Sequence, residues 1–335
     1  MSKYQFGMVG CGHIGTRHAA HIHNLGNLLC VCDVVEAKAR TLADQYHAKA
    51  YTSLTEMLET EKDLQVLSVC TPNGLHAAHS IEAMMQGLHV VCEKPMAIRS
   101  GDCKAMIEAA LTMQKHLFIV KQNRYNPPVV AVKKLLDAGK LGKIFSIQLN
   151  CFWNRPAAYY ENSWKGTLSL DGGTLFTQFS HFIDLLYWMF GEVEKVQGFS
   201  GNLHHSGVTE FEDTGVLSLQ FVNGILGSFH YTVNSYRENM EGSLTIFAEQ
   251  GTIKIGGAYL NEISYQNGNG FYIDELEAAK PANHYGAYQG SMSNHDKVYE
   301  NVIAVLKGHE KIATNAYEGL KTVEMIEQFY RAIRK

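Results

Sequence analysis

The chain has 335 residues, of which 46% are hydrophobic and 19% charged, and its formal net charge is −4. This length is enough for two domains with separate cores, and the composition is that of a globular protein. The negative net charge argues against a nucleic-acid-binding surface, which needs a basic stripe. No apolar run approaches the roughly 18 residues of a membrane span.

The first residues lead directly into a strand expected at 4–9, which leaves no room for a signal peptide. The seven cysteines lack the spacing of a disulfide framework and indicate reduced thiols. We therefore expect a cytoplasmic protein with no nucleic-acid and no membrane partner.

The first motif follows that strand. Gly10, Gly12 and Gly15 have the G-x-G-x-x-G spacing of a dinucleotide-binding turn, and a helix is expected after them at 14–25. In such a turn Gly10 allows the sharp bend, Gly12 lets a pyrophosphate approach the backbone, and Gly15 lets the helix pack on the strand. The phosphates would lie at the positive end of the helix.

A second apolar strand, expected at 28–32, ends at Asp33. A carboxylate at this position can accept hydrogen bonds from the adenosine ribose and repel an additional phosphate. The sequence therefore predicts NAD as the cofactor. The alternative is an ordinary βαβ unit that binds no nucleotide.

The remainder of the first 122 residues alternates apolar runs with amphipathic segments. Strands are expected at 64–70, 88–92 and 117–121, and helices at 35–46, 75–86 and 101–116. Continuous apolar strands separated by helices predict a parallel sheet covered on both faces. Ligands bind at the carboxyl ends of such strands. The candidates there are Thr71, Pro72, Asn73, Glu93, Lys94, Pro95, Gln122, Asn123 and Arg124.

From residue 123 the pattern changes. A helix is expected at 129–138, and strands with two-residue alternation follow at 143–152, 194–201, 213–221, 225–234 and 243–248. Asn223 and Gly224 form a hairpin signal between two of them, and the chain closes with helices at 296–306 and 317–333. We expect an α/β protein with a dinucleotide-binding Rossmann domain at 1–122. An α+β domain with a large, mostly antiparallel sheet is expected at 123–335.

Lys94 is the strongest catalytic candidate of the first domain. Its ammonium group can hydrogen-bond a substrate hydroxyl, and burial can depress its pKa enough to share a proton. A surface ion pair is the alternative.

The second candidate is a polar stripe on an apolar helix expected at 174–188. Thr177, His181 and Asp184 are spaced to share one face of that helix. Buried polar groups need partners, and a substrate is one such partner. His181 suits a general base near neutral pH, and Asp184 is expected to orient it. A core histidine bonded to the backbone is the alternative.

The segment 151–164 is rich in aromatic and polar side chains. Trp153, Asn154, Arg155, Tyr159, Tyr160 and Trp164 suit a sugar ring that carries a charged group. A subunit interface would use the same residues. Arg124 is expected to face an anionic substrate.

No metal site is expected, although the chain has 16 histidines. His18 and His21 lie on the first helix and are expected to have no carboxylate or cysteine partner, and no zinc motif is present. His204 and His205 fall in a predicted loop and are expected to face water.

With these motifs, the chain resembles the glucose–fructose oxidoreductase, inositol dehydrogenase and MocA (Gfo/Idh/MocA) family over essentially its whole length. The motifs are VGCGHIG at 9–15, CTPNGLH at 70–76, EKP at 93–95 and DGGTLFTQFSHFID at 171–184. The resemblance implies a Rossmann domain with an open-faced antiparallel-sheet domain, NAD(P) as cofactor, and oxidation of a hydroxyl group on a polyol or sugar. It places Lys94 and His181 at the reacting carbon. Many members carry Asp where this chain has Thr177.

Further segments resemble the WlbA/WbpB type within the family, namely KQNRYNPP at 121–128, FWNR at 152–155 and SNH at 293–295. This resemblance implies NAD-dependent oxidation of the carbon-3 hydroxyl of UDP-N-acetylglucosaminuronic acid for bacterial surface polysaccharide, by a homo-oligomer. Inositol or a free hexose is the alternative substrate. The expected cofactor residues are Gly10, Gly12, His13, Ile14, Gly15, Asp33, Thr71, Pro72, Asn73, His76, Glu93, Lys94 and Gln122. The expected substrate residues are Lys94, Arg124, Asn154, Arg155, Tyr160, Trp164, Thr177, Gln178 and His181.

Overall fold

The computed structural model describes residues 3–277, 281–284 and 289–334. The chain forms two compact units: Met1–Lys121 with His295–Val323, and Gln122–Asn294 with Glu324–Lys335. The predicted domain division, 1–122 and 123–335, stays a prediction. The compact units differ from it chiefly because residues 295–323 pack with the first unit. No helix within the described ranges is both long and apolar enough to cross a membrane.

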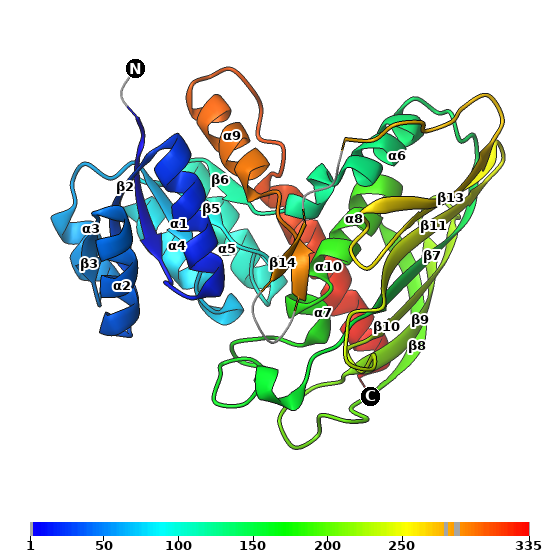
Figure 1. The fold of residues 1–335 in the computed structure, drawn as a ribbon, viewed down its shortest axis with the longest axis horizontal. Coiled ribbons are helices and arrows are strands. Elements are labelled where there is room, and N and C mark those ends of the chain that lie inside the picture. The colour runs from blue at the N-terminus through cyan, green and yellow to red at the C-terminus, as the bar shows by residue number, and fades with distance from the viewer. Residues whose placement is uncertain (1–2, 278–280, 285–288, 335) are drawn as a thin grey trace. The chain divides into compact units, whose positions relative to one another are not determined.

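The first unit is built on a six-stranded parallel sheet with the order β3-β2-β1-β4-β5-β6 (Figure 1). Its strands are β1 (Gln5–Val9), β2 (Asn27–Cys32), β3 (Lys49–Tyr51), β4 (Val66–Val69), β5 (His89–Cys92) and β6 (Leu117–Ile119). The apolar runs form strands as predicted. Strand β3 was not predicted, because it is only three residues long and lies at the edge of the sheet.

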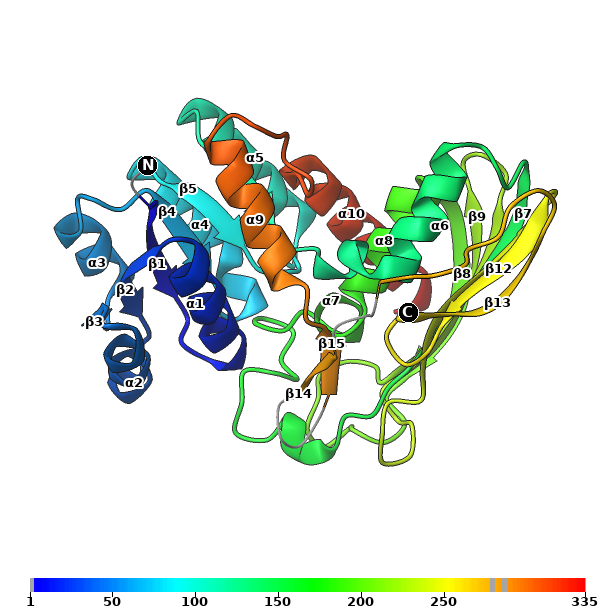
Figure 2. The same ribbon diagram turned by 45° about the horizontal axis from the view of Figure 1, so that its top comes forward.

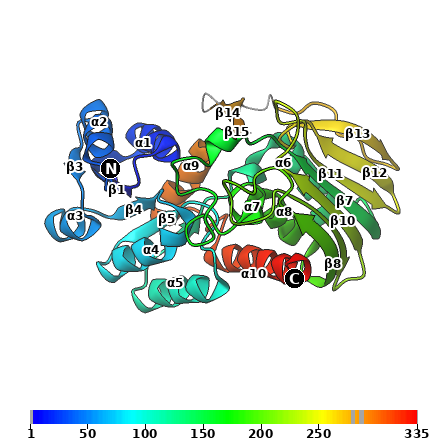
Figure 3. The ribbon, with the colours of Figure 1, turned by 90° about the horizontal axis from the view of Figure 1, so that it is seen from below.

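Helices cover both faces of this sheet, as continuous apolar strands require. They are α1 (His13–Leu25), α2 (Glu36–Tyr46), α3 (Leu54–Thr60), α4 (His76–Met85) and α5 (Ser100–Thr112). Figure 3 shows α1 and α2 on one face and α4 and α5 on the other. Helix α9 (His295–Leu306) packs against α1, and α10 (Ala316–Ile333) begins in the first unit and ends in the second.

The second unit contains a seven-stranded sheet with the order β13-β12-β11-β7-β10-β9-β8. Its strands are β7 (Ile144–Phe152), β8 (Val193–Gly201), β9 (Thr214–Phe221), β10 (Leu226–Thr232), β11 (Glu241–Ala248), β12 (Gly251–Gly256) and β13 (Glu262–Gly268). All neighbours are antiparallel except β7 and β10. Gly224, at φ +85°, turns the predicted hairpin between β9 and β10. The predicted fold class is confirmed.

Helices α6 (Pro127–Asp137) and α8 (Ser180–Phe190) lie on one side of this sheet (Figure 2). The strands alternate as half-buried strands do. Leu149, Leu217 and Phe229 are paired across neighbouring strands and fully buried. The intervening side chains Val216 and Leu226 are about half exposed, so one face of the sheet forms the core of the unit and holds α8 in place.

Candidate active site

The three glycines of the turn between β1 and α1 are explained by different features of the structure. Gly10 has φ +94°, and a Cβ there would lie 2.5 Å from the carbonyl oxygen of Cys70. A Cβ at Gly15 would lie 2.0 Å from the carbonyl oxygen of Gly10. Both positions therefore require glycine to bring the strand, the turn and the helix together.

Gly12 differs from the other two, because a Cβ added there would meet nothing within 4 Å in the described part of the chain. Packing therefore does not explain this glycine. It is the N-cap of α1, and no side chain accepts a hydrogen bond at this cap. That is the arrangement that a phosphate group fits. His13, which is exposed, and the half-buried Ile14 form the first turn of the same helix.

Asp33 is fixed beside the glycine turn by two backbone hydrogen bonds. Its Oδ2 accepts from the N–H of Cys11 and its Oδ1 from the N–H of Val35, both at 2.8 Å. A carboxylate has about four lone-pair positions, so each oxygen retains capacity for a ribose hydroxyl. The geometry fits the predicted cofactor role.

The turns after β4 and β5 are joined by His76. Its Nδ1 lies 2.7 Å from the carbonyl oxygen of Pro95, and its Nε2 lies 2.9 Å from that of Thr71. Burial lowers the pKa of His76. Because both ring nitrogens face backbone carbonyl groups, His76 connects the two turns. Its contact with the cofactor stays a prediction. Pro72 and the buried Asn73 lie on the first of these turns.

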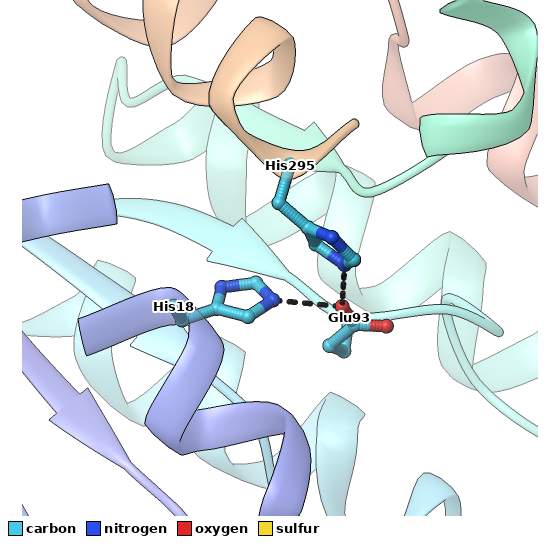
Figure 4. A group of neighbouring side chains, drawn as sticks. All are labelled: His18, Glu93 and His295. Atoms are coloured by element: carbon cyan, nitrogen blue, oxygen red, sulfur yellow. Dashed lines mark hydrogen bonds and ion pairs between the residues drawn. The ribbon is translucent and has the colours of Figure 1, made fainter. Parts of the chain in front are cut away.

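Glu93 is buried and faces two histidines of the same unit (Figure 4). Its Oε1 lies 2.8 Å from Nε2 of His18 and 3.4 Å from Nε2 of His295. The expectation that His18 lacks a carboxylate partner is therefore wrong, because β5 ends beside α1. Glu93 is therefore buried between two histidines, and its contact with the cofactor stays a prediction.

Lys94 follows directly and is half-buried. Its backbone N–H donates to Oε2 of Glu93 at 2.9 Å, and the Lys94–Pro95 peptide bond is cis. The backbone of Lys94 is therefore hydrogen-bonded to the side chain of the residue before it.

In the second unit, Arg124 pairs with Asp184. Nε and one terminal nitrogen of the guanidinium each donate to Asp184 at 2.7 Å, and the guanidinium lies 4.9 Å from the ring centroid of Trp188. Arg124 is 4% exposed. Arg124 and Asp184 are therefore paired inside the protein. Whether Arg124 also faces a substrate, and whether Asp184 orients His181, stays a prediction.

The helix expected at 174–188 is interrupted. Helix α7 (Thr174–Thr177) ends before α8 begins at Ser180, and the N–H of Phe179 reaches back five residues to the carbonyl oxygen of Thr174. Thr177 and His181 therefore lie on separate helices. His181 is in the first turn of α8 and is buried.

Thr177 donates its hydroxyl hydrogen bond to Asp171. Burial raises the pKa of Asp171 to about 6, although the hydrogen bond from Thr177 lowers it. No role was predicted for Asp171, because a carboxylate in a glycine-rich turn gives no signal of its burial.

Two of the predicted substrate residues meet. Nε of Arg155 donates to Oε1 of Gln178 at 2.8 Å, and Nε2 of Gln178 donates to the hydroxyl of Tyr159 at 2.9 Å. The guanidinium of Arg155 lies 5.0 Å from the ring centroid of Trp153. This arrangement makes Arg155 a rigid cation, held by side chains from two segments.

The other residues of the second unit that were predicted to contact ligands lie next to different parts of the chain. Asn154 donates through Nδ2 to the carbonyl oxygen of Ser235 at 2.6 Å. Gln122 donates through Nε2 to Oγ of Ser291 at 2.9 Å. Tyr160 is buried, whereas Trp164 is half-buried. Asn154 and Gln122 therefore use side-chain amide hydrogens to hold the chain itself.

His205 is buried, contrary to expectation. Its Nδ1 lies 3.1 Å from Oδ2 of Asp213, and its Nε2 lies 2.8 Å from the carbonyl oxygen of Arg155. The ring of Tyr160 packs edge-on against it at 5.3 Å. Asp213 lies eight residues after His205, and this spacing alone does not identify it as the partner.

Comparisons with known proteins agree with this architecture. Residues 4–121 match the model of an oxidoreductase family with an NAD-binding Rossmann fold, GFO_IDH_MocA, and residues 129–254 match the GFO/IDH/MocA C-terminal domain. Among curated proteins, the inositol 2-dehydrogenase of Salmonella typhimurium is 27% identical over 232 residues, which cover 65% of this chain and 64% of that protein. The chain thus spans about 64% of the length of these curated relatives.

Two solved structures are similar over nearly the whole chain. The WlbA dehydrogenase from Bordetella pertussis, in complex with NADH and UDP-GlcNAcA, is 36% identical with a TM-score of 0.87, covering 99% of this chain and 97% of that chain. The WlbA dehydrogenase from Chromobacterium violaceum, also in complex with NADH and UDP-GlcNAcA, is 35% identical with a TM-score of 0.88. That similarity covers 100% of this chain and 94% of the other.

Proposed function

The chain belongs to the GFO/IDH/MocA family of oxidoreductases, with an NAD-binding Rossmann domain, and from this premise we propose its reaction. It oxidises the carbon-3 hydroxyl of UDP-N-acetylglucosaminuronic acid to the 3-keto sugar nucleotide, with NAD as the oxidant. The observation that carries the proposal is the similarity, at 35–36% identity over nearly the full length, to two dehydrogenases solved with NADH and UDP-GlcNAcA.

The cofactor residues follow from the first unit. Gly12 leaves room for the pyrophosphate at the start of α1, and Asp33 accepts hydrogen bonds from the adenosine ribose. The proposed contacts further along the cofactor come from Thr71, Pro72 and Asn73. When bound, NAD takes up the hydride that leaves carbon 3.

The proposed chemistry at the sugar needs two protein groups. Lys94 hydrogen-bonds the reacting oxygen, and His181 accepts the proton of the hydroxyl group as the carbonyl forms. One proton and one hydride leave the alcohol, so its oxidation is balanced. A positioned base of this kind contributes typically 10²–10⁴-fold in rate.

Substrate recognition is proposed for Arg155, the rigid cation described above, and for the residues near it. Arg155 is held by Gln178, and a fixed guanidinium suits the carboxylate of a uronic acid. Asn154, Tyr160, Trp164 and Thr177 remain proposed substrate residues. Arg124, which is paired with Asp184, also remains a proposed substrate residue.

A substrate panel tests this proposal. Purified protein with NAD is incubated with UDP-N-acetylglucosaminuronic acid, UDP-N-acetylglucosamine, UDP-glucuronic acid, myo-inositol and glucose. Product is detected by mass spectrometry as the loss of two hydrogens, which registers even one turnover. We expect the keto product from the first compound at the highest kcat/KM.

Inositol is the second candidate, because inositol 2-dehydrogenases are among the curated relatives. Preferential oxidation of myo-inositol or glucose would replace our proposal with this one. We further propose a cytoplasmic homo-oligomer, a dimer or tetramer, that serves bacterial surface-polysaccharide synthesis.

A further inference from the structure

The Glu93 carboxylate connects buried groups from three parts of the first unit. His18 comes from α1, Glu93 follows β5, and His295 begins α9 (Figure 4). Both histidines are 0% exposed and Glu93 is 4% exposed. A buried carboxylate is stable only when its charge is compensated, and these two imidazoles face its Oε1.

From His18, hydrogen bonds continue away from Glu93 to two hydroxyl groups, those of Tyr299 and Ser68. Nδ1 of His18 lies 2.7 Å from the hydroxyl of Tyr299, which in turn lies 2.8 Å from Oγ of Ser68. Tyr299 and Ser68 are fully buried. The His18 ring is therefore held at both nitrogens and cannot turn away from Glu93.

The other oxygen of Glu93 has a different partner. Oε2 accepts the backbone N–H of Lys94 at 2.9 Å, and the carbonyl of Pro95 lies 2.7 Å from Nδ1 of His76. The backbone on both sides of the Lys94 side chain is thus attached to buried groups. Rotation of the Glu93 carboxylate would break its hydrogen bond to the Lys94 N–H.

The same three side chains have the composition of a metal site, but their spacing favours hydrogen bonding. Both imidazoles converge on one oxygen atom, and 2.8 Å between His18 and Glu93 is a hydrogen-bond distance. Ligands of a tetrahedral zinc ion, at about 2.0–2.1 Å from the metal, surround a common centre instead. Burial raises the pKa of Glu93, but the bonds from His18 and His295 outweigh it and hold the pKa well below its usual range.

We propose that His18 and His295 are positioning residues for Lys94, and that they act through the carboxylate of Glu93. The kinetic consequence rests on the function proposed above, whereas the structural consequence does not. The proposal also gives a reason why residues 295–323 pack with the first unit, since His295 supplies the second imidazole that faces Glu93.

The test uses full-length protein and ring-preserving variants. His18→Phe and His295→Phe keep an aromatic ring and remove the nitrogen that faces Glu93. His21→Phe is the matched control, because the His21 ring stacks on His295 at 6.2 Å between centroids and serves neither Glu93 nor Lys94 in our scheme. His295→Gln restores an N–H donor. Melting temperature and NAD affinity show which variants are folded.

The first readout needs no substrate. We expect the backbone amide of Lys94 to exchange its hydrogen at least about 10-fold faster in the two Phe variants, because its acceptor is no longer fixed. The control should exchange as the wild type does, and His295→Gln should recover part of the protection. Unchanged exchange in both Phe variants would overturn the proposal, even if the protein oxidises no UDP-sugar at all.

The second readout is a double-mutant cycle on turnover. We expect kcat to fall about 10–100-fold in each folded Phe variant while KM changes little, since small displacements of a reacting group carry such costs. In the Lys94→Ala background the same substitutions should have almost no further effect. Fully additive effects would show that the histidines do not act through Lys94.

The third readout concerns metal ions. Protein prepared with a chelator should contain no stoichiometric zinc, and adding Zn²⁺ should not raise its turnover or melting temperature. One tightly held metal ion per chain, lost together with activity on chelation, would overturn the proposal in favour of a metal site.

Discussion

Arg124 holds Asp184 through two hydrogen bonds of 2.7 Å, and both side chains are at most 4% exposed. The pair joins the segment before α6 to the middle of α8, and His181 lies one turn before Asp184 on that helix. The pair therefore supports the helix that carries the proposed base.

We expect Arg124→Ala to lower the free energy of unfolding by about 3–5 kcal/mol, because it leaves a buried carboxylate without its cation. Chemical denaturation measures this change. Lys133→Ala is the control: Lys133 also lies over Trp188, at 5.0 Å, but it pairs with the exposed Asp137 and should cost at most about 1 kcal/mol. Equal effects of the two substitutions would contradict the assigned role of the pair.

The glycine turn gives a matched pair of substitutions. At Gly12 a Cβ enters clear space, so Gly12→Ala should change the unfolding free energy by less than about 1 kcal/mol but weaken NAD binding at least about 10-fold. At Gly15 the Cβ meets the carbonyl oxygen of Gly10, so Gly15→Ala should cost about 1–3 kcal/mol in stability. Calorimetric titration and thermal melts separate the effects, and normal NAD binding by Gly12→Ala would count against the phosphate site.

Asp33 is expected to decide between the two nicotinamide cofactors. Its carboxylate would repel the additional phosphate of NADP, so NAD should bind at least about 10-fold more tightly. Asp33→Ala should narrow this ratio. Direct binding of both cofactors to both proteins checks this, and equal or tighter binding of NADP to the wild type would refute the assignment.

Asp171 makes stability depend on pH. Its pKa is about 6 in the folded protein and 3.8 ordinarily, so between these values the folded state holds a proton that the unfolded state has released. Relative to Asp171→Asn, the wild type should therefore lose roughly 2 kcal/mol of stability as the pH rises from 4 to 7. Denaturation of both proteins across this range tests the sign. A wild type that becomes more stable relative to Asp171→Asn as the pH rises would contradict the prediction.

The sequence predicted what depends on local geometry. Gly10, Gly12, Gly15 and Asp33 were identified because a strand, a turn and a helix constrain them within one βαβ unit, and the structure places Asp33 beside the turn. The family and the NAD cofactor predicted from the motifs are confirmed by the family models.

The sequence did not predict the pairing of buried charges. Arg124 and Glu93 follow strands, where ligands commonly bind, but their partners Asp184 and His295 are distant in the sequence and are chosen by packing. The interruption of the helix after Thr177 was also missed, because an apolar run continues through it. Whether the remaining site residues contact cofactor or substrate stays a prediction.

Lys94→Ala and His181→Asn test the proposed catalytic pair. Each should lower kcat by about 10²–10⁴-fold while NAD affinity stays close to that of the wild type, since neither residue holds the pyrophosphate or the adenosine. Steady-state turnover measures kcat, and calorimetric titration measures the affinity for NAD. Turnover at the wild-type level in both variants would remove the assignment.

The central claim is hydride removal from carbon 3 of a UDP-linked uronic acid. The most direct measurement uses UDP-N-acetylglucosaminuronic acid carrying deuterium at carbon 3, with mass analysis of the nicotinamide and sugar products. Our account predicts that the deuterium appears in the reduced cofactor and that the sugar becomes the 3-keto compound. Reduced cofactor without deuterium, or no reaction with this sugar alongside rapid oxidation of myo-inositol, would contradict it.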